Sequence, residues 1–118
     1  MEQDWVFPYE QTLYDVAPGL HGAQAAWLGA IDSLTILDRK THELIRMVCT
    51  AALRNPPGVE RHAQLATEAG ATWDEIVCAL ALTQPAFGVL PAVEALAPAR
   101  AGFDSGRAAE VDEDSEGG

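Results

Sequence analysis

Apolar residues recur at intervals of three and four along much of this chain, which is the spacing of one face of an α-helix. Between Pro18 and Leu34 they form a continuous stripe, and we expect Trp27 to be a core residue. The stripe consists of Leu20, Ala23, Trp27, Ala30, Ile31 and Leu34. No segment has the pattern of a convincing strand, so the sequence predicts an all-α fold.

A second helix is predicted from Asp38, a good N-cap residue, to Arg54. It must end there because the following Asn-Pro-Pro-Gly at 55–58 cannot continue it. Its polar face would carry Glu43, Arg46 and Thr50. Its apolar face is expected to consist of Leu44, Ile45, Val48, Cys49 and Ala52.

Two further helices have clear ends. Asn55 can cap the first of them, and Gly70 ends it with a left-handed residue. His62 lies on the apolar face of this helix. Thr72 and Glu75 form a capping box that begins the next helix, which is predicted to be the most deeply buried. The apolar positions of that helix are Trp73, Ile76, Val77, Leu80 and Ala81.

The last helical stretch is interrupted by prolines. Pro85 is expected to kink the preceding helix near Ala81, and a new helix is expected to begin at Pro91 and to end or bend at Pro98. Its apolar positions are Val93, Leu96 and Ala97.

These patterns divide the chain into an N-terminal arm at 1–17, a helical domain at 18–103 and a tail at 104–118. The arm contains Trp5, Phe7 and Tyr9, which are expected to pack on the domain or on a neighbouring subunit, with an active-site lid as the alternative. The tail consists mainly of glycine, serine and acidic residues, so we expect it to be disordered.

The charge excludes some functions. The formal net charge is −11, from 18 acidic and 7 basic residues. Such an excess of acid opposes binding to nucleic acid and to anionic membranes, which requires clustered Lys and Arg. No apolar run reaches the roughly 20 residues of a membrane span, and the N-terminus lacks the features of a signal peptide. A cytoplasmic protein is therefore expected.

The two cysteines, Cys49 and Cys78, lie 29 positions apart within apolar helical patterns. We expect both to be buried free thiols. No Cys-x-x-Cys pair or Cys/His spacing typical of a metal site occurs, so no metal is predicted.

Glu43 and His62 are the acid/base pair that local patterning places beside a possible pocket. A histidine on an apolar face can equally be a satisfied core residue, and Glu43 can be a solvated helix residue. Tyr14, His21 and Gln84 are further possible substrate-binding donors, Gln84 because it lies beside the expected kink at Pro85.

Several segments, in order and spacing, resemble the carboxymuconolactone decarboxylase and alkyl hydroperoxidase D superfamily. They are Leu-Asp-Arg-Lys-Thr-His-Glu-Leu-Ile at 37–45, His62, Glu-Ala-Gly-Ala-Thr-Trp-Asp-Glu-Ile at 68–76 and Phe-Gly-Val-Leu-Pro-Ala at 87–92. The resemblance covers about residues 18–97. It implies a compact bundle of about five to six helices, with the alkyl hydroperoxidase D-like fold, that assembles into homo-trimers or hexamers through helix faces.

The superfamily has a peroxidase-like branch with a Glu, a Cys-x-x-Cys pair and a His. Glu43 and His62 match the acid and the histidine at that branch's separation of 19 residues, but the cysteine positions fall on Asn55 and Gly58. Without a thiolate there can be no attack on a peroxide, so peroxidase activity is excluded.

The decarboxylase branch, which needs no cofactor, resembles the chain better. By this resemblance His62 is the general acid/base and Glu43 its support. The branch's Glu and Arg before the 37–45 segment are replaced by Ala30 and Leu34, which predicts a less charged substrate. The sequence thus favours decarboxylation, isomerisation or ring rearrangement of a small carbonyl- or lactone-containing molecule. The alternative is a non-catalytic oligomeric scaffold or small-molecule binding protein.

Overall fold

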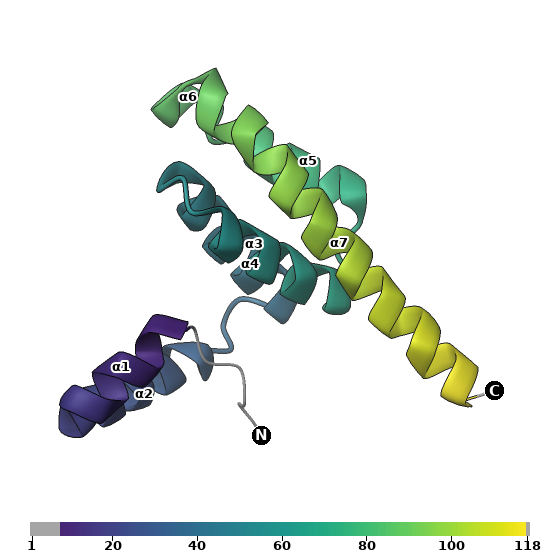
Figure 1. Cartoon of the computed structure of the whole chain (residues 1–118). Helices are drawn as coiled ribbons and strands as arrows, with labels where there is room; N and C mark the ends of the chain where they lie inside the picture. Colours follow the sequence, from purple (N-terminus) through teal and green to yellow (C-terminus); the bar gives the residue numbers. More distant parts are fainter. Residues whose placement is uncertain (1–7, 118) are drawn as a thin grey trace. The chain divides into compact units, whose positions relative to one another are not determined.

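The structure, a computed structural model, describes the backbone of residues 8–117 and the side chains of residues 10–110. Helices joined by short connections make up the described residues, without a strand, as the sequence predicted. The chain divides into two compact units, residues 1–36 and 37–118, and each is described by itself. The helices are α1 (Pro8–Val16), α2 (Pro18–Asp32), α3 (Arg39–Ala52), α4 (Pro56–Glu68), α5 (Trp73–Ala81), α6 (Gln84–Phe87) and α7 (Val89–Gly117) (Figure 1).

The first unit contains α1 and α2, which pack on each other. Ala17 separates them, and Pro18 begins α2, where a missing amide hydrogen costs nothing. No residue of α2 is buried, and Trp27 is 66% exposed, so the prediction that Trp27 belongs to the core is wrong for the single chain. Two helices alone cannot enclose so large a side chain. Trp5 and Phe7 of the predicted arm lie outside the described residues, as does the side chain of Tyr9.

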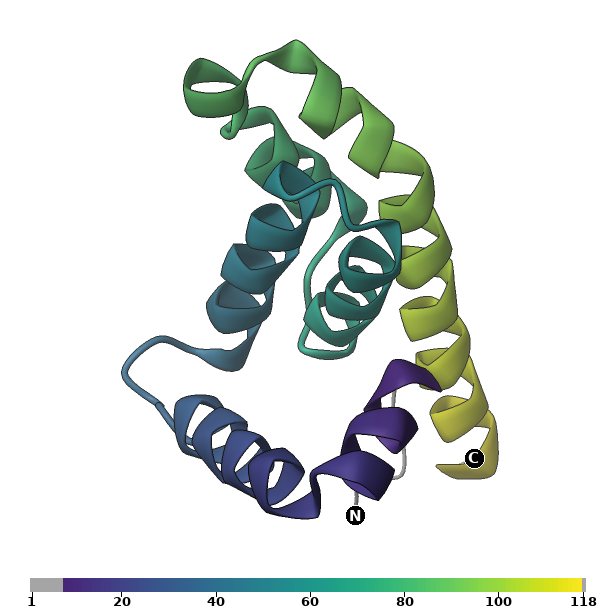
Figure 2. The ribbon, with the colours of Figure 1, turned by 60° about the vertical axis from the view of Figure 1, so that its left-hand side comes forward.

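The second unit is built around α4, which lies between α3 and α7, with α5 packed on α7 and α3 (Figure 2). The core of this unit is made mostly of small residues. Its buried apolar members are Met47, Ala51, Val59, Ala63, Ala66, Ala71, Ile76, Leu80, Ala92, Ala95, Ala99 and Phe103.

Two glycines of α7 allow that helix to approach α4 closely. A Cβ atom at Gly102 would collide with the carbonyl oxygen of Glu60 and lie 2.9 Å from the amide nitrogen of Gln64. A Cβ atom at Gly106 would lie 2.7 Å from Cβ of Thr67 and 2.9 Å from the carbonyl oxygen of Gln64. These glycines are therefore required by packing, because backbone atoms cannot move aside as a side chain can.

The predicted caps at Asp38, Gly70 and the Thr72–Glu75 box are confirmed. The Asp38 carboxylate accepts a hydrogen bond of 2.7 Å from the amide of Thr41. The Thr72 hydroxyl accepts from the Glu75 amide at 3.1 Å, and the Glu75 carboxylate accepts from the Thr72 amide at 2.9 Å. Gly70, with φ of +105°, follows α4 in the left-handed region that glycine occupies without strain.

The turn from α3 to α4 contains a residue in an unusual conformation. Arg54 has φ of +56°. Its amide donates to the carbonyl of Ala51 at 3.0 Å, and that of Asn55 to the carbonyl of Thr50 at 3.0 Å, which is the pattern of a Schellman motif. Glycine usually occupies this position, and a residue with a Cβ atom costs about 1 kcal/mol there. Asn55 then caps α4 by accepting from the amide of Gly58 at 3.3 Å.

The predicted orientation of α3 is only partly right: Leu44 and Val48 pack against the core as expected, but the most buried positions differ. Its buried residues are Glu43, Met47 and Ala51, whereas Ile45 and Cys49 are exposed. Cys49 was expected to be a buried thiol, and so was Cys78, which is also exposed. The nominally polar face of α3 can turn inward because the carboxylate of Glu43 has partners there, described below.

Several predictions for α5 to α7 need correction. Of α5, only Ile76 and Leu80 are buried, and α4 buries more of its residues. Pro85 does not kink α5, because α5 has already ended at Ala81 and Pro85 lies in the first turn of α6. Gly88, with φ of +88°, then separates α6 from α7.

Helix α7 begins at Val89, before Pro91, and continues through Pro98. Its buried face is formed by Ala92, Ala95 and Ala99 rather than by Val93 and Ala97. The disorder expected from Asp104 onward is not what the structure has, since α7 remains helical to Gly117. Packing of Phe103 and Gly106, both buried, holds this part of α7 against its neighbours.

Replacing Gly102 by alanine tests the close contact between α4 and α7. We expect Gly102→Ala to lower the free energy of unfolding by about 1–3 kcal/mol, the range for overpacking a core. Urea denaturation measures this change. Gly29→Ala is the matched control, since a Cβ atom there has no neighbour within 4 Å, and the better helix propensity of alanine should raise stability by up to about 1 kcal/mol. Equal effects of both substitutions would contradict the packing described.

Candidate functional site

Glu43 and His62, both predicted site residues, form a hydrogen-bonded pair between α3 and α4. Nδ1 of His62 lies 2.9 Å from Oε1 of Glu43. The three residues at 53–55 reverse the chain between the two helices, which brings the middle of α4 beside the first half of α3. The side chain of Glu43 is 4% exposed and that of His62 is 16% exposed. The pair is therefore largely screened from solvent, with only the histidine partly accessible.

The second oxygen of Glu43 is also bound. Oε2 accepts a hydrogen bond of 2.9 Å from Nη1 of Arg39, one turn earlier in α3. A buried carboxylate requires such partners, since an unpaired charge in the interior is very costly. The sequence analysis missed Arg39. Its spacing of four residues from Glu43, which is the helical neighbour distance, is a signal that could have identified it.

The environment of Glu43 favours its ionised form. Burial alone would raise its pKa, but the hydrogen bond and charge of His62 oppose this, together with the hydrogen bond from Arg39 and the charge of Arg46. These effects outweigh burial, so the pKa of Glu43 lies below its ordinary value. Glu43 is thus a carboxylate at neutral pH.

An ionised Glu43 determines which nitrogen of His62 carries the proton. A carboxylate can only accept, so Nδ1 must be the donor in this hydrogen bond. In the neutral ring the lone pair then lies on Nε2, which makes no hydrogen bond to any residue that the structure describes. Nε2 can take a proton from a substrate, and the adjacent carboxylate stabilises the imidazolium that results. In this arrangement His62 can act as a general base, and the Glu43 carboxylate holds the imidazole in the required orientation.

The other predicted site residues belong to other helices. Tyr14 and His21 are in the first unit, with ring centroids 5.4 Å apart in an edge-to-face arrangement. Nε2 of His21 lies 3.9 Å from Oε1 of Glu10. Gln84 is in the second unit at the start of α6, and its side chain makes no hydrogen bond to a described residue. Their role in substrate binding stays a prediction.

Neither a cluster of metal-ligating side chains nor a membrane-spanning helix is found in the part of the chain that the structure describes. Among the side chains of residues 10–110, no group of three or more from His, Cys, Asp and Glu could hold a metal ion. Within the same range, no helix combines the length and apolar character needed to cross a bilayer.

The fold and the buried pair together define an all-α protein with a glutamate–histidine dyad on adjacent helices. A model of the carboxymuconolactone decarboxylase family matches residues 19–101, and the chain belongs to this family. Comparison with curated proteins and with solved structures finds no match.

Gly58, at one of the two positions where the peroxidase-like branch has cysteine, is enclosed by α3. It is buried, and a Cβ atom there would lie 2.7 Å from Cγ2 and 3.0 Å from Cβ of Thr50. The hydroxyl of Thr50 is held by the carbonyl of Met47 at 2.7 Å. The local packing is therefore fitted to glycine, in keeping with the absence of a thiol at this position.

The lowered pKa of Glu43 predicts a pH-dependent stability. A carboxyl group with a lowered folded-state pKa stabilises the protein fully above its unfolded-state pKa of about 4.3, and this contribution is lost as pH falls through the folded-state value. We expect Glu43→Gln to lower the free energy of unfolding at pH 7 by about 1–3 kcal/mol. The difference from the unmodified protein should shrink between about pH 5 and pH 3.

Urea denaturation at a series of pH values measures this effect. Glu60→Gln, an exposed substitution on the same helix as His62, is the control and should change stability little at any pH. A deficit of Glu43→Gln that stayed constant from pH 7 to pH 3 would show that its carboxylate is not the stabilising form.

Proposed function

We propose that this protein is a cofactor-independent enzyme that catalyses proton transfer on a small molecule containing a carbonyl or lactone group. The single observation that supports this most is the 2.9 Å hydrogen bond between Nδ1 of His62 and the buried carboxylate of Glu43. Membership of the carboxymuconolactone decarboxylase family adds to it. The reaction would be a decarboxylation, an isomerisation or a ring rearrangement.

In the proposed mechanism, His62 exchanges a proton with the substrate through Nε2. For isomerisation, Nε2 removes a proton from the carbon next to the carbonyl, and the electron pair moves into the carbonyl to form an enolate. In a substrate with a neighbouring carbon–carbon double bond the enolate is conjugated, and the imidazolium then returns the proton to the far carbon of that conjugated system. For decarboxylation, Nε2 first takes the proton of the substrate's carboxyl group. Loss of carbon dioxide from the carboxylate then leaves an enolate, and the imidazolium returns the proton to its carbon. Glu43 acts as a positioning residue that stabilises the imidazolium throughout.

The substrate is expected to carry little charge. At the positions where the decarboxylase branch has Glu and Arg, this chain has Ala30 and Leu34. Neither can form an ion pair or a hydrogen bond through its side chain. A lactone or ketone without several carboxylates therefore fits better than a dianionic lactone.

A homo-trimer or hexamer is part of the proposal. The second unit exposes several large apolar side chains between the end of α5 and the first turns of α7, namely Leu82, Phe87, Val89, Leu90 and Val93. Exposed apolar residues that are contiguous in this way are typical of a surface covered by another chain. Assembly would also enclose the partly accessible His62, if subunits meet near it.

The alternative proposal is a non-catalytic scaffold or small-molecule binding protein with the same fold. It is supported by two hollows of the second unit, one beside Pro56 and Pro91 and the other beside Trp73 and Arg107, neither of which is lined by Glu43 or His62. Binding of a ligand without turnover would favour this alternative over the enzyme.

Substitution of the pair tests the enzyme. A panel of small lactones and β-keto acids is first screened for a substrate that the protein converts. On that substrate, His62→Gln should lower kcat by about 10²–10⁴-fold, the usual contribution of a general acid/base. Glu43→Gln should lower kcat less and shift the pH dependence of kcat, because His62 remains but loses its anionic partner. Glu60→Gln should leave both unchanged. Unchanged turnover in both His62→Gln and Glu43→Gln would overturn the site assignment.

The assembly is tested by mass in solution. The chain has a mass of 12.6 kDa, and light scattering coupled to gel filtration should give about three or six times this value. Phe87→Glu places a charge among the exposed apolar residues and should shift the population toward the monomer. Ala101→Glu, at an exposed position without a large apolar side chain, is the control. A monomeric unmodified protein would exclude the proposed assembly.

A further inference from the structure

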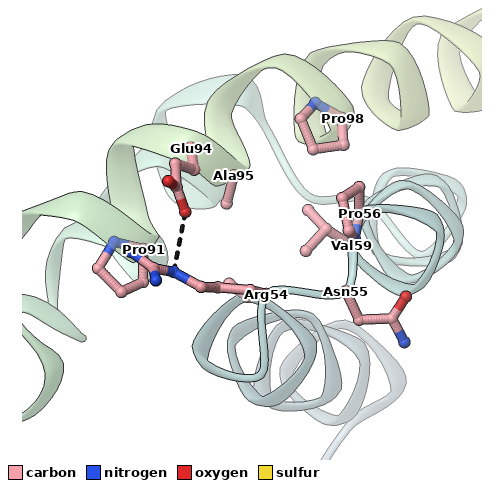
Figure 3. A pocket seen from close by; sticks show the side chains of 9 residues that line it. Arg54, Asn55, Pro56, Val59, Pro91, Glu94, Ala95 and Pro98 are labelled. Atoms are coloured by element: carbon pink, nitrogen blue, oxygen red, sulfur yellow. Dashed lines mark ion pairs between the residues drawn. The ribbon is translucent and has the colours of Figure 1, made fainter.

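A cavity of about 160 Å³ lies between the turn from α3 to α4 and the first half of α7 (Figure 3). Apolar atoms form most of its wall, with Pro56, Pro91 and Pro98 contributing rigid rings and Val59 and Ala95 filling between them. A dry apolar cavity of comparable size, about 150 Å³, is enough to bind a benzene ring. The cavity can thus hold a single small ring or a short branched chain.

The polar groups of this cavity are concentrated in one ion pair. Nε of Arg54 lies 3.0 Å from Oε1 of Glu94 on α7. Figure 3 shows Arg54 reaching across to Glu94, with Pro56, Val59 and Pro98 on the opposite side. The pair is about half exposed, so a molecule in the cavity can reach it.

The conformation of Arg54 is a second observation at the same place. Its φ of +56° puts an arginine where glycine would be unstrained. The ion pair with Glu94 does little to offset this strain, because pairs as exposed as this one contribute little to stability. Backbone strain of this kind is concentrated at ligand-binding sites, where the side chain is needed in one direction.

We propose that this cavity binds a small uncharged cyclic molecule that carries a carbonyl group next to an N–H or O–H group, as in an amide or a lactam. Arg54 has further N–H groups with no protein partner among the described residues, and they can donate to the carbonyl. Glu94 has a second oxygen that can accept from the N–H or O–H group. Because the two side chains neutralise each other, the site offers hydrogen-bond donors on Arg54 and an acceptor on Glu94 without a net charge.

The charge balance decides against an ionic ligand. A carboxylate would approach Arg54 but would be repelled by Glu94 at the same mouth, and an ammonium group would meet the reverse situation. Since Glu43 and His62 do not line the cavity, this site is separate from the proposed proton-transfer site. Its test does not depend on any catalytic activity.

Benzamide is the probe, titrated into the full ¹⁵N-labelled chain and followed by chemical-shift changes of the backbone amides. We expect saturable changes at Ala51, Val59 and Ala95, with a dissociation constant in the millimolar range or below, as is usual for a ligand of this size. Benzoate, which has the same ring with a negative charge, should bind at least tenfold more weakly.

Two variants keep the proposal falsifiable. Arg54→Gly relieves the left-handed backbone, so the variant should fold, yet it should raise the dissociation constant of benzamide at least tenfold. Glu94→Gln keeps the size of the side chain and removes its charge, which should weaken benzamide severalfold and improve the relative binding of benzoate. Arg107 lies outside the cavity and pairs with Glu110. The control variant Arg107→Gln should therefore bind benzamide as tightly as the unmodified protein does.

Three results would overturn the proposal: no saturable change at about 20 mM benzamide, far above the affinity expected for a ring of this size; tighter binding of benzoate than of benzamide; or unchanged benzamide affinity in Arg54→Gly.

Discussion

The close contact between α7 and α4 is the constraint on which the second unit depends. Gly102 and Gly106 leave no room for a Cβ atom, and the alanines that precede them on α7 extend the same contact. Backbones that approach so closely bring many atoms into van der Waals range without large side chains. Helix α4 is thereby fixed on one side, and its other side is left to face α3.

The burial of the Glu43 carboxylate follows from the packing of α4 between α3 and α7. With α4 held by α7, His62 lies toward α3, where the carboxylate of Glu43 is its hydrogen-bond partner. A carboxylate in this position is tolerable only because Arg39 binds its second oxygen and Arg46 adds positive charge nearby. Removal of one partner would leave the remaining charges buried and uncompensated, which costs more than the pair itself contributes. The pair is therefore a product of the helix packing, and the chemistry proposed for it depends on that packing.

The helix ends could be predicted from the sequence because capping is local: Asp38, Gly70 and the Thr72–Glu75 box each act within one turn. The buried residues Ile76 and Leu80 of α5 were predicted too, from their apolar spacing. The buried faces of α3 and α7 could not be predicted in full, since alanine gives little hydrophobic signal and a partnered Glu43 turns α3 from its expected face. For the same reason Cys49 seemed a core residue and Asp104 the start of a disordered tail. Local patterning selected Glu43 and His62 as candidates, and the family's spacing of 19 residues supported joining them. Their contact itself could not be predicted from either helix alone, because it depends on how α3 and α4 pack.

The distribution of apolar residues connects stability to function. Burying an alanine removes far less apolar surface from water than burying a leucine or phenylalanine, and the interior here is mostly alanine, while Leu82, Phe87 and Leu90 are exposed. A single chain of this size thus leaves much of its available hydrophobic stabilisation unused. We infer that association of copies would recover it, and that the same step would remove water from around a partly accessible His62. In a drier environment the electrostatic influence of Glu43 on the imidazole becomes stronger. Assembly and acid/base chemistry would then be two consequences of one property of the sequence, a small-residue core with its large apolar residues outside.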